Sequence, residues 1–400
     1  MQPLVGLRVV EVGGTLAAGV ATKRYSDFGA RVIKVEPPTG GEIRRLAPFP
    51  DDRPHLDTGA MHMAFDTGKR SLALDLSTPS GREVLDRVLA DADLLIAHQP
   101  VPELRALLRR VDSESGPCTV AITAHGLDGP YAERIENDLT LFGWSTRAHR
   151  HSVQGREPLR YAPQVGMIQV ANTAGMLGLV AVWGRRQDGR RRDVEVAGVE
   201  ALMGNVDSSF FLWAVNGAVQ PRSAGLYRGI YPMGAYPCKD GHVLFSAARH
   251  PFFTNLCRVI GHPEAAFDPR FTDPSQRADH FEEFRAMLEP WLAVRTKYDI
   301  FHEMQEAGVM CAPVLDASEV MTDPQSVARR SYVTVAQPGP GDEPIEVTVP
   351  AAPYRMNGLH SDRWQAHAAP RLGEHTGEIL DELGYSRDEQ IALFRAGVTG

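Results

Sequence analysis

The sequence predicts an open α/β sheet of the doubly wound kind, followed by a region of different composition. Short apolar runs alternate with helix-like runs from residue 6 to residue 126, and glycine or proline ends several of the apolar runs. A strand, a helix and a second strand within about thirty residues form a βαβ unit with parallel strands. Repetition of this unit indicates a parallel sheet with helices on its faces.

The elements of the sheet region follow one another in order. "GLRVVEV" is mostly apolar and β-branched, and Gly13-Gly14 ends it. After the third apolar run, a Ser or Thr cap and Pro79 in the first turn indicate the start of a helix. The predicted strands are 6–12, 30–36, 70–76, 93–98 and 119–126, and the predicted helical runs are 15–28, 77–92 and 102–111.

The composition changes to α+β between Pro221 and about Val333. "MGAYPCKDGHVLFSA" predicts a hairpin that turns at Lys239-Asp240-Gly241. The further predicted elements are helices at 280–294 and 297–308, a loop at 337–344, and two helices within 373–398 separated by Gly384-Tyr385-Ser386. We expect three segments: 1–220 for the first part of a large domain, 221–333 for a small α+β domain, and 334–400 for the return to the large domain.

The composition excludes several classes of function. Apolar residues make up 43% and charged residues 23%, as in ordinary globular proteins, and the net charge of -8 gives no reason to expect nucleic acid or an anionic membrane as partner. The four cysteines contain no C-x-x-C pair, so no metal site is expected. The N-terminal residues lack a secretory signal pattern, and no run of 18 uninterrupted apolar residues occurs. We therefore expect a soluble cytoplasmic protein.

Four local patterns have both a functional and a plain structural interpretation. The turn at Gly13-Gly14, with Glu36 ending the next strand, is similar to a dinucleotide site, but "GGTLAAG" lacks the G-x-G-x-x-G spacing and favours a tight turn. The basic segments "RAHRHSVQGR" and "GRRQDGRRRD" favour a solvated loop and a helix end with its turn, with anion contact and phosphate binding as the respective alternatives. Asp138 is most simply a helix N-cap, with a catalytic carboxylate as the alternative.

Motifs along nearly the whole chain resemble one known family. They are "LVGLRVVEVGGTLAAG", "DFGARVIKVEPPTGGEIRR", "TGKRSLALDLSTPSGREVLDRVLADADLLI", "GLDGPY", "GAYPCKDGHV" and "LGEHTGEILDELGYS". In this order they are similar to the class III CoA-transferases, a family that includes formyl-CoA and carnitine CoA-transferases and 2-methylacyl-CoA racemases. The resemblance implies a Rossmann-like large domain built from both chain ends, a small inserted domain, and two chains interlocked as linked rings.

The resemblance also implies a chemistry. In the transferases an aspartate attacks an acyl-CoA thioester, which gives a mixed anhydride and then an aspartyl-CoA thioester that loads an acceptor acid. In the racemases a His and an Asp move a proton beside the thioester carbonyl. The expected substrates are therefore coenzyme A as acyl-CoA and a small carboxylic acid, with no other cofactor.

The chain departs from the family pattern where the nucleophile is expected. The family aspartate lies in a segment resembling D-x-x-x-G. Matching that glycine to Gly175 places the aspartate position at Ala171, and a shift of one residue in either direction would place it at Val170 or Asn172. None of these side chains can form an anhydride. The racemase His–Asp pair matches Asn137-Asp138, so its histidine is missing.

Other positions match or depart from the family's coenzyme A site. Pro37 replaces a basic residue, and "HQPVP" at 98–102 lacks the arginine of the usual N-F-R-P-G turn. For Lys69 and Arg70 a solvated strand start is the alternative to phosphate binding. The residues that the resemblance places at coenzyme A are Ala17, Arg44, Arg45, Lys69, Arg70, Leu74 and His98.

Four hypotheses follow. The leading one is a subunit that lacks the nucleophile and pairs with a related chain that carries the aspartate. The others are a homodimeric acyl-CoA enzyme that uses Asp138 or another acid, a non-catalytic CoA-binding or regulatory protein, and an oxidoreductase built on the Rossmann-like half.

Overall fold

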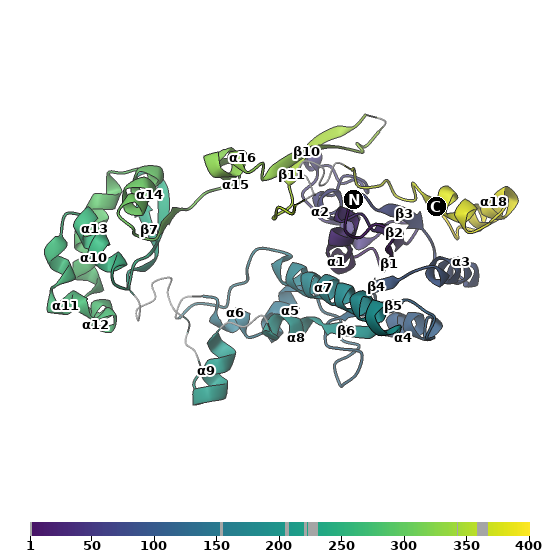
Figure 1. The fold of residues 1–400 in the computed structure, drawn as a ribbon, viewed down its shortest axis with the longest axis horizontal. Coiled ribbons are helices and arrows are strands. Elements are labelled where there is room, and N and C mark those ends of the chain that lie inside the picture. Colours follow the sequence, from purple (N-terminus) through teal and green to yellow (C-terminus); the bar gives the residue numbers. More distant parts are fainter. Residues whose placement is uncertain are drawn as a thin grey trace. The chain divides into compact units, whose positions relative to one another are not determined.

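The structure is a computed structural model that describes residues 2–152, 155–204, 208–219, 222, 231–341, 343–357 and 367–400 (Figure 1). The chain forms two compact units. The first contains residues 1–147, 160–210 and 324–400, and the second contains 148–159 and 211–323. The domain boundary expected at 220/221 lies outside the described residues, and the boundary at 333/334 stays a prediction.

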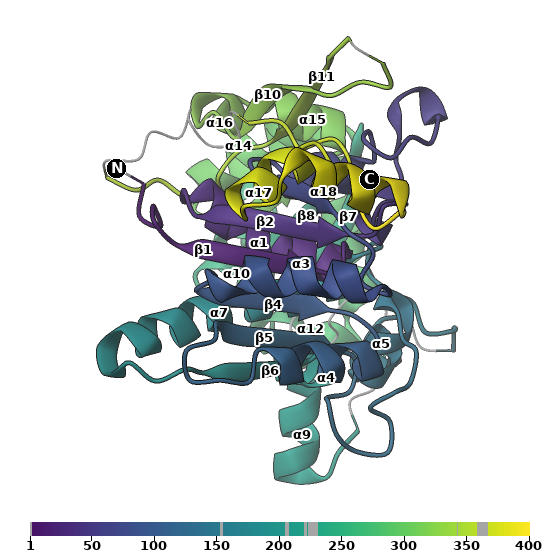
Figure 2. The same ribbon diagram turned by 90° about the vertical axis from the view of Figure 1, so that its right-hand side faces the viewer.

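A parallel sheet forms the centre of the first unit, which confirms the predicted α/β class. Its strand order is β3-β2-β1-β4-β5-β6, and every neighbouring pair is parallel. Figure 2 shows β2, β1, β4, β5 and β6 in sequence across the sheet. The strands are β1 (Arg8–Val12), β2 (Arg31–Glu36), β3 (Arg70–Ala73), β4 (Leu94–His98), β5 (Cys118–Thr123) and β6 (Asp193–Ala197).

Helices cover both faces of this sheet. One face packs against α1 (Leu16–Asp27) and α7 (Val165–Asp188), around residues such as Val9 and Ile96. The opposite face packs against α3 (Pro79–Ala90), α4 (Val101–Arg110) and α17 (Thr376–Glu382). The unit's other helices are η1 (Glu42–Arg45), η2 (Pro50–Asp52), α2 (Ala60–Phe65), α5 (Asp138–Trp144), α8 (Gly198–Gly204), α16 (Pro324–Ala328) and α18 (Arg387–Arg395), and α6 (Arg147–Arg150) begins at the last residue of this stretch and continues into the second unit.

Helix α7 lies very close to α1 because its inner face carries small residues. A Cβ added to Gly175 would lie 2.6 Å from the carbonyl oxygen of Ala21, so only glycine allows this approach. The Tyr25 hydroxyl donates a hydrogen bond of 2.7 Å to the carbonyl of Gly175. Alone among the described residues, α7 is long and apolar enough to cross a membrane by length and composition, with a mean hydropathy of 1.6. Its inner face belongs to the core of this unit, and core helices of soluble proteins pass the same test.

The C-terminal part of the chain returns to the N-terminal half of the first unit. β10 (Tyr332–Gln337) and β11 (Ile345–Pro350) form an antiparallel hairpin. The Gln337 side chain then donates to the carbonyl of Met63 and accepts from the backbone of Ala369, at 3.1 and 2.9 Å. Helix α17 carries Glu382, which pairs with Arg31 and Arg70.

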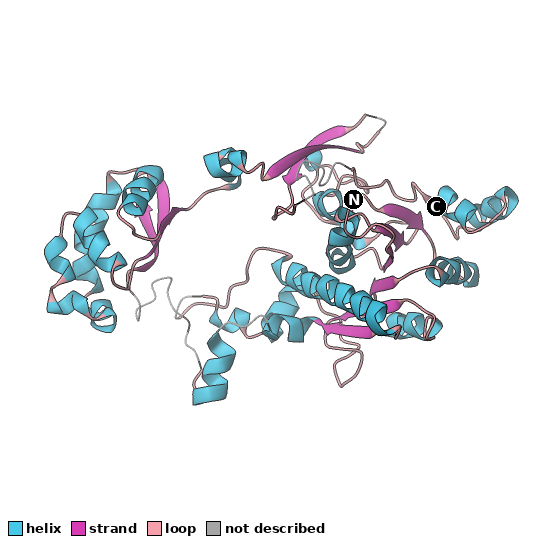
Figure 3. Cartoon of the chain, viewed as in Figure 1, coloured by secondary structure: helices cyan, strands magenta, loops and turns pink. Residues whose placement is uncertain are grey.

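The second unit combines helices with a small sheet (Figure 3). Its sheet has the order β7-β8-β9 and is antiparallel. Buried Arg277 donates to the carbonyls of Tyr231, Ala248 and Phe271 and lies over the ring of Phe253. The elements are β7 (Met233–Cys238), β8 (Gly241–Ser246), α10 (Phe252–Val259), η4 (Pro263–Ala266), α11 (Pro269–Thr272), α12 (Pro274–Asp279), α13 (Phe281–Ala293), α14 (Lys297–Glu306), β9 (Cys311–Pro313) and α15 (Ala317–Thr322). Helix α9 (Ser208–Asn216) contains the point where the chain passes into this unit.

The predicted elements agree with the observed ones where local signals are strong. Thr78 caps α3 by accepting from the backbone of Gly81, with Pro79 in the first turn. The hairpin between β7 and β8 turns where it was predicted. Strand β6 and the strands on either side of the predicted loop at 337–344 were not predicted. The basic segment at 147–156, interpreted as a loop, begins with the short helix α6, and its residues 153–154 lie outside the described residues.

Candidate functional site

The candidate site lies at the carboxyl edge of the parallel sheet, where the strand order reverses. β2 and β3 follow β1 in the chain and lie on one side of it in the sheet. The chain then crosses over, and β4 lies on the other side of β1. Ligands of open α/β sheets bind outside the carboxyl ends of the strands at such a switch point. Gly13 follows β1 with a φ of 123°, and a Cβ at this position would overlap the carbonyl oxygen of His98 at the end of β4. The two strand ends therefore meet closely because residue 13 is glycine.

His98 and Thr15 face each other across this switch point. The His98 Nδ1 lies 2.8 Å from the hydroxyl oxygen of Thr15, the N-cap of α1. Removal from water lowers the pKa of His98 to about 4, so the imidazole is neutral near pH 7. A neutral imidazole beside a helix N-terminus offers hydrogen bonds without adding a charge to the edge.

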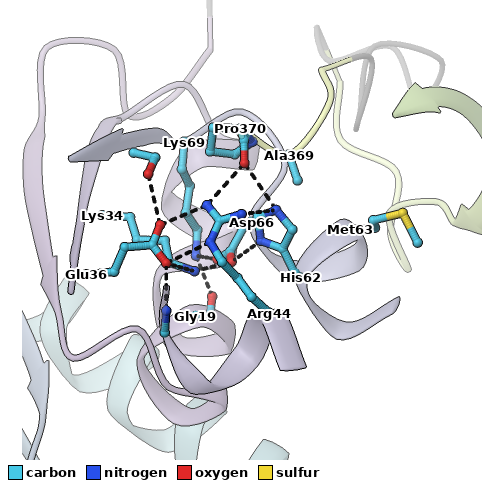
Figure 4. A network of polar contacts seen from close by, with 12 residues as sticks. Gly19, Lys34, Glu36, Arg44, His62, Met63, Asp66, Lys69, Ala369 and Pro370 are labelled. Atoms are coloured by element: carbon cyan, nitrogen blue, oxygen red, sulfur yellow. Dashed lines mark hydrogen bonds and ion pairs between the residues drawn. The ribbon is translucent and has the colours of Figure 1, made fainter. Parts of the chain in front are cut away.

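A network of buried charges lies beneath this edge (Figure 4). Arg44 makes a bidentate contact with Glu36, with both N–O distances at 2.8 Å, and donates to Asp57 at 2.9 Å. Lys69 donates to Glu11 at 2.8 Å, to Asp66 at 2.7 Å and to the carbonyl of Gly19 at 2.8 Å. The network connects β1, β2, η1, α2 and the start of β3.

The network extends from these elements to the return segment through two carbonyl contacts. The Arg44 guanidinium donates to the carbonyl of Pro370 at 3.1 Å, and the Nε2 of His62 lies 3.1 Å from the same oxygen. Asp57 also accepts from the backbone of Leu372 at 2.9 Å. Buried charges thereby hold residues 370–372 against the N-terminal half.

The buried acids are ionised because cations surround them. Burial alone would raise the pKa of Glu36, but Lys34 and Arg44 outweigh it and hold that pKa at about 2. Burial would likewise raise the pKa of Asp66, yet Lys34 and Lys69 hold it well below its usual range. For His62 burial itself decides the direction: it lowers the pKa of the imidazole and outweighs the neighbouring Asp66, which would raise it. Its Nδ1 lies 2.8 Å from Asp66 and its Nε2 lies 3.0 Å from Arg44, which fits a neutral ring that donates to the acid and accepts from the arginine.

This arrangement bears on two residues that the sequence assigned to coenzyme A. The side chains of Arg44 and Lys69 are both fully buried, and each binds carboxylates of the same chain. All three donors of the Lys69 ammonium are used internally. A phosphate contact by either residue would require this network to open. The predicted binding of coenzyme A by Arg44 and Lys69 therefore stays a prediction, and their burial does not favour it.

The other predicted coenzyme A residues lie in different places. Exposed Arg45 donates to the carbonyls of Thr39, Gly40 and Gly41. Arg70 begins β3, at the amino edge of the sheet, and pairs with acids of α17. Ala17 lies on the buried face of α1 in the apolar core, and Leu74 follows β3, where it bridges to Thr399. Of the predicted set, His98 lies at the switch point, Arg44 and Lys69 share the buried network, and the remaining residues do not converge on one pocket.

The structure corrects the interpretation of Asp138 as the N-cap of its own helix. Asn137 caps α5 and forms a capping box with Thr140. Asp138 instead accepts the backbone N–H groups of Gln164 and Met167, at 3.2 and 2.8 Å, and so caps the start of α7. Gln164, at the N-cap position of α7, has a φ of 67° and makes no side-chain cap. A carboxylate at a helix N-terminus is stabilised by the orphan N–H groups and the helix dipole.

The expected nucleophile position lies on α7. Ala171 and Val170 are fully buried in the apolar core, and Asn172 is exposed. Their side chains provide a methyl, an isopropyl and an amide group, none of which attacks a thioester. Among the described residues, no group of three or more His, Cys, Asp or Glu could hold a metal ion.

Sequence reasoning missed the acids that accompany the buried cations. One local signal was available: His62, Asp66 and Lys69 are spaced by four and three residues, which places them on one side of a helix and its following turn. The partners Glu11 and Glu36 come from neighbouring strands. Their meeting with α2 depends on tertiary packing and has no local sequence pattern.

The comparisons with known proteins agree with this fold. The family model "CoA-transferase family III" matches residues 4–376, and the chain belongs to this family. The structure of a CaiB/BaiF family protein from Brucella suis is 27% identical in sequence and superposes with a TM-score of 0.82. The match includes 96% of this chain and 99% of the Brucella suis chain. A protein from M. tuberculosis with 22% identity, covering 95% of this chain and 99% of its own, has the same fold with a TM-score of 0.80.

Curated relatives match the chain from end to end. Succinyl-CoA–D-citramalate CoA-transferase of Chloroflexus aurantiacus is 27% identical over 99% of this chain and 97% of its own length. The succinyl-CoA:(R)-benzylsuccinate CoA-transferase subunit BbsE of Thauera aromatica is 28% identical over 99% and 98%. The succinyl-CoA–L-malate CoA-transferase beta subunit of Chloroflexus aurantiacus is 27% identical over 98% and 97%. The family predicted from the sequence motifs is therefore confirmed.

Proposed function

We propose that the chain is a subunit of a heteromeric class III CoA-transferase, and that a related partner chain supplies the aspartate nucleophile. The observation that carries this proposal is the alanine at position 171, where the family motif places the aspartate. Val170 and Asn172, one residue to either side, provide no nucleophile either. The exchange of CoA between two carboxylic acids requires such a group if it proceeds through a covalent intermediate.

The partner's aspartate carries out the covalent steps in this proposal. Its carboxylate attacks the thioester carbonyl of acyl-CoA, and the CoA thiolate leaves as a mixed anhydride forms. The thiolate then attacks the aspartyl carbonyl, which releases the donor acid and leaves an aspartyl-CoA thioester. The acceptor carboxylate repeats the two steps in the reverse sense, so CoA leaves on the acceptor and the aspartate is regenerated.

The names of two relatives support the heteromeric assembly. BbsE and the Chloroflexus aurantiacus beta subunit are each named as one subunit of a succinyl-CoA-dependent transferase, and both match this chain over nearly its whole length. We propose succinyl-CoA or a similar acyl-CoA as donor, a small carboxylic acid as acceptor, and an interlocked arrangement of the two chains in the cytoplasm. In this proposal the present chain completes the partner's fold and contributes its switch point at Thr15 and His98 to holding CoA.

The alternative of a homodimer that uses Asp138 is less well supported by the contacts. Both carboxylate oxygens of Asp138 already accept backbone N–H groups of α7. A carboxylate that attacks a thioester would have to give up these contacts and expose the helix start. This geometry favours a capping role.

Co-expression tests the proposal. The chain is produced alone and together with a family member from the same source that carries the aspartate in its D-x-x-x-G segment. Each sample is incubated with succinyl-CoA and then with hydroxylamine or borohydride, and the modified peptide is located by mass spectrometry. We expect an adduct on the partner's aspartate in the co-expressed sample and none on the chain alone. Transferase activity or an adduct in the lone chain would refute the proposal.

A further inference from the structure

His125 and Glu136 form a pair of titratable side chains outside the site described above. His125 follows the end of β5 by two residues, and Glu136 immediately precedes Asn137, the N-cap of α5. The Nε2 of His125 lies 3.0 Å from the Oε1 of Glu136, and the indole N–H of Trp144 donates to the same oxygen at 3.2 Å. The two side chains are 7% and 10% exposed, so this His125–Glu136 pair is largely shielded from water.

The contact with Glu136 leaves the second ring nitrogen of His125 available. A carboxylate only accepts hydrogen bonds, so Nε2 donates, and in the neutral ring Nδ1 carries the lone pair. The hydrogen bond from His125 is the main cause that holds the pKa of Glu136 below its usual value, so the carboxylate is ionised near pH 7. Among the described residues Nδ1 has no hydrogen-bond partner, and it is not buried. Nδ1 therefore reaches solvent and can accept a proton from a bound molecule.

Two partly exposed aromatic rings frame the imidazole of His125. Trp144 meets it edge-on, with ring centroids 5.2 Å apart and planes at 86°, and the centroid of Tyr131 lies 5.9 Å away. These two rings lie 5.5 Å from each other, and the residues are 47% and 49% exposed for Tyr131 and Trp144. A histidine ring that is oriented by a carboxylate on one nitrogen and is free on the other has the arrangement of a general base.

The His125–Glu136 pair lies at the same edge of the sheet as Thr15 and His98. Strands β4 and β5 are parallel neighbours, and His98 pairs with Ile122 in their register. β5 ends at Thr123, two residues before His125. His125 therefore follows the carboxyl end of the strand next to His98, and ligands of a doubly wound sheet bind outside these strand ends.

We propose that the His125–Glu136 pair gives this chain a second activity, the hydrolysis of acyl-CoA thioesters by water; this inference rests on the proposed function, which places CoA at the switch point. The Nδ1 of His125 removes a proton from water as the water oxygen bonds to the thioester carbonyl carbon. The tetrahedral intermediate then breaks its C–S bond, and the imidazolium gives its proton to the departing CoA thiolate. The products are a carboxylic acid and CoA, and the pair returns to its first state. Glu136 is a positioning residue that holds the ring and stabilises the imidazolium.

The acids of this edge favour water over a covalent intermediate. The chain has Ala171 where the family motif places the nucleophile, and Asp138 accepts two backbone N–H groups of α7. Glu136 itself is held by His125 and Trp144. A pair that only tied its loop together would use Nε2 and would not need Nδ1 to remain free. The two roles therefore differ in their dependence on Nδ1.

The first test measures the release of CoA thiol from succinyl-CoA with a thiol reagent, above the rate without protein. The samples are the chain alone and its assembly with the aspartate-bearing family member, whose aspartate is replaced by asparagine. We expect thiol release without a hydroxylamine-sensitive adduct. His125→Gln should lower the rate by roughly 100-fold or more, because a general base contributes about 10²–10⁴-fold. His302→Gln, on an exposed position of α14, is the matched control and should keep the rate. No thiol release from either sample, or equal release by His125→Gln, overturns the inference.

A second measurement separates catalysis from a structural role. Added imidazole should restore part of the rate of His125→Ala, because it supplies the missing base beside Glu136. Glu136→Gln should lower kcat with KM unchanged, and Glu136→Asp should recover part of the loss. Circular dichroism and calorimetric titration with CoA follow the fold and binding of each variant. Loss of the fold or of CoA binding together with the rate, without rescue by imidazole, assigns the pair a structural role and overturns the inference.

The proposed function fails through a different result. An acyl adduct or transferase activity in the lone chain refutes it, whether or not thiol is released. Absence of both adduct and hydrolysis in the lone chain leaves the proposed function standing, and absence of hydrolysis from the assembly as well removes only the second activity.

Discussion

The carboxylate of Asp138 lies 2.8 Å from the backbone nitrogen of Met167, and through this contact the start of α5 holds the first turn of α7. The second oxygen accepts from Gln164 at 3.2 Å. Asp138, which the sequence suggests as a possible catalytic acid, therefore positions helix α7. This helix carries Ala171, the expected position of the nucleophile. Its removal should act on stability before it acts on chemistry.

We predict that Asp138→Ala lowers the free energy of unfolding by about 1 kcal/mol, the usual cost of losing a helix cap. Asp138→Asn should lose less, because an amide oxygen still accepts one N–H group. Denaturant unfolding followed by circular dichroism measures both variants, with exposed Asp128→Asn as the control. If Asp138→Asn kept full stability and abolished transfer in the assembled enzyme, Asp138 would be catalytic and the capping role secondary.

Ala171→Asp should install a nucleophile at the cost of stability. Ala171 is fully buried, so a carboxylate there should lower the free energy of unfolding by about 2 kcal/mol or more. In an assembly whose partner has lost its own aspartate, we expect the acyl-CoA adduct to appear on this chain. Asn172→Asp, on the exposed neighbour, should change stability by about 0.5 kcal/mol or less and give no adduct. An adduct on Asn172→Asp alone would move the nucleophile position by one residue.

Lys69→Met should destabilise the protein strongly. The substitution leaves the carboxylates of Glu11 and Asp66 buried without their shared cation, and breaking a buried ion pair costs about 3–5 kcal/mol. Exposed Arg109→Met serves as the matched control and should be near neutral. Chemical denaturation and isothermal titration with CoA are measured on each variant. A folded Lys69→Met protein of normal stability that no longer binds CoA would restore the phosphate-binding role predicted from the sequence.

His62 should make stability depend on pH. In the unfolded chain its pKa is near 6.5, and burial lowers it in the folded state. The unfolded state therefore binds more protons between these two values, so the stabilisation is complete above pH 6.5 and is lost as the pH falls towards the lower pKa. The slope should reach at most about 1.4 kcal/mol per pH unit.

Measurements between pH 5 and 8 keep the effect of His62 separate from that of Glu36, whose contribution is lost only below its ordinary pKa of 4.5. His62→Gln should reduce the dependence in this range without abolishing it, because buried His98, with a pKa of about 4, contributes in the same range. Exposed His302→Gln should leave the dependence unchanged. An equally steep dependence in His62→Gln would assign the effect to another group.

The sheet was predictable because each of its early strands carries its own local signal. Apolar runs, several of them ended by glycine or proline, mark the strands from β1 to β5, and a hydroxyl cap with Pro79 marks α3. Strand β6 escaped prediction because charged Asp193 and Glu195 alternate with valine at the edge of the sheet. The apolar run within α7 gives no one-sided pattern, because its small inner residues and its large outer residues are both apolar.

The site was less predictable because its contacts are long-range. The lysine and arginines of "GKR" and "EIRR" have the composition of a phosphate site, and the sequence alone does not reveal the carboxylates that surround two of them. Glu11 lies 58 residues from Lys69, and Pro370 lies 326 residues from Arg44. Which cations remain available to a ligand is decided by these partners.

The attachment of residues 370–382 to the N-terminal half has a consequence for synthesis. Helix α17 supplies the partner of Arg31 across 351 residues of sequence, and Pro370 accepts from Arg44 across 326. A ribosome delivers roughly 5–20 residues per second, so β1, β2 and α2 wait on the order of half a minute before their last contacts emerge. During that interval Arg44 lacks the carbonyl of Pro370 and Arg31 lacks Glu382, and chaperone dependence should be greatest there.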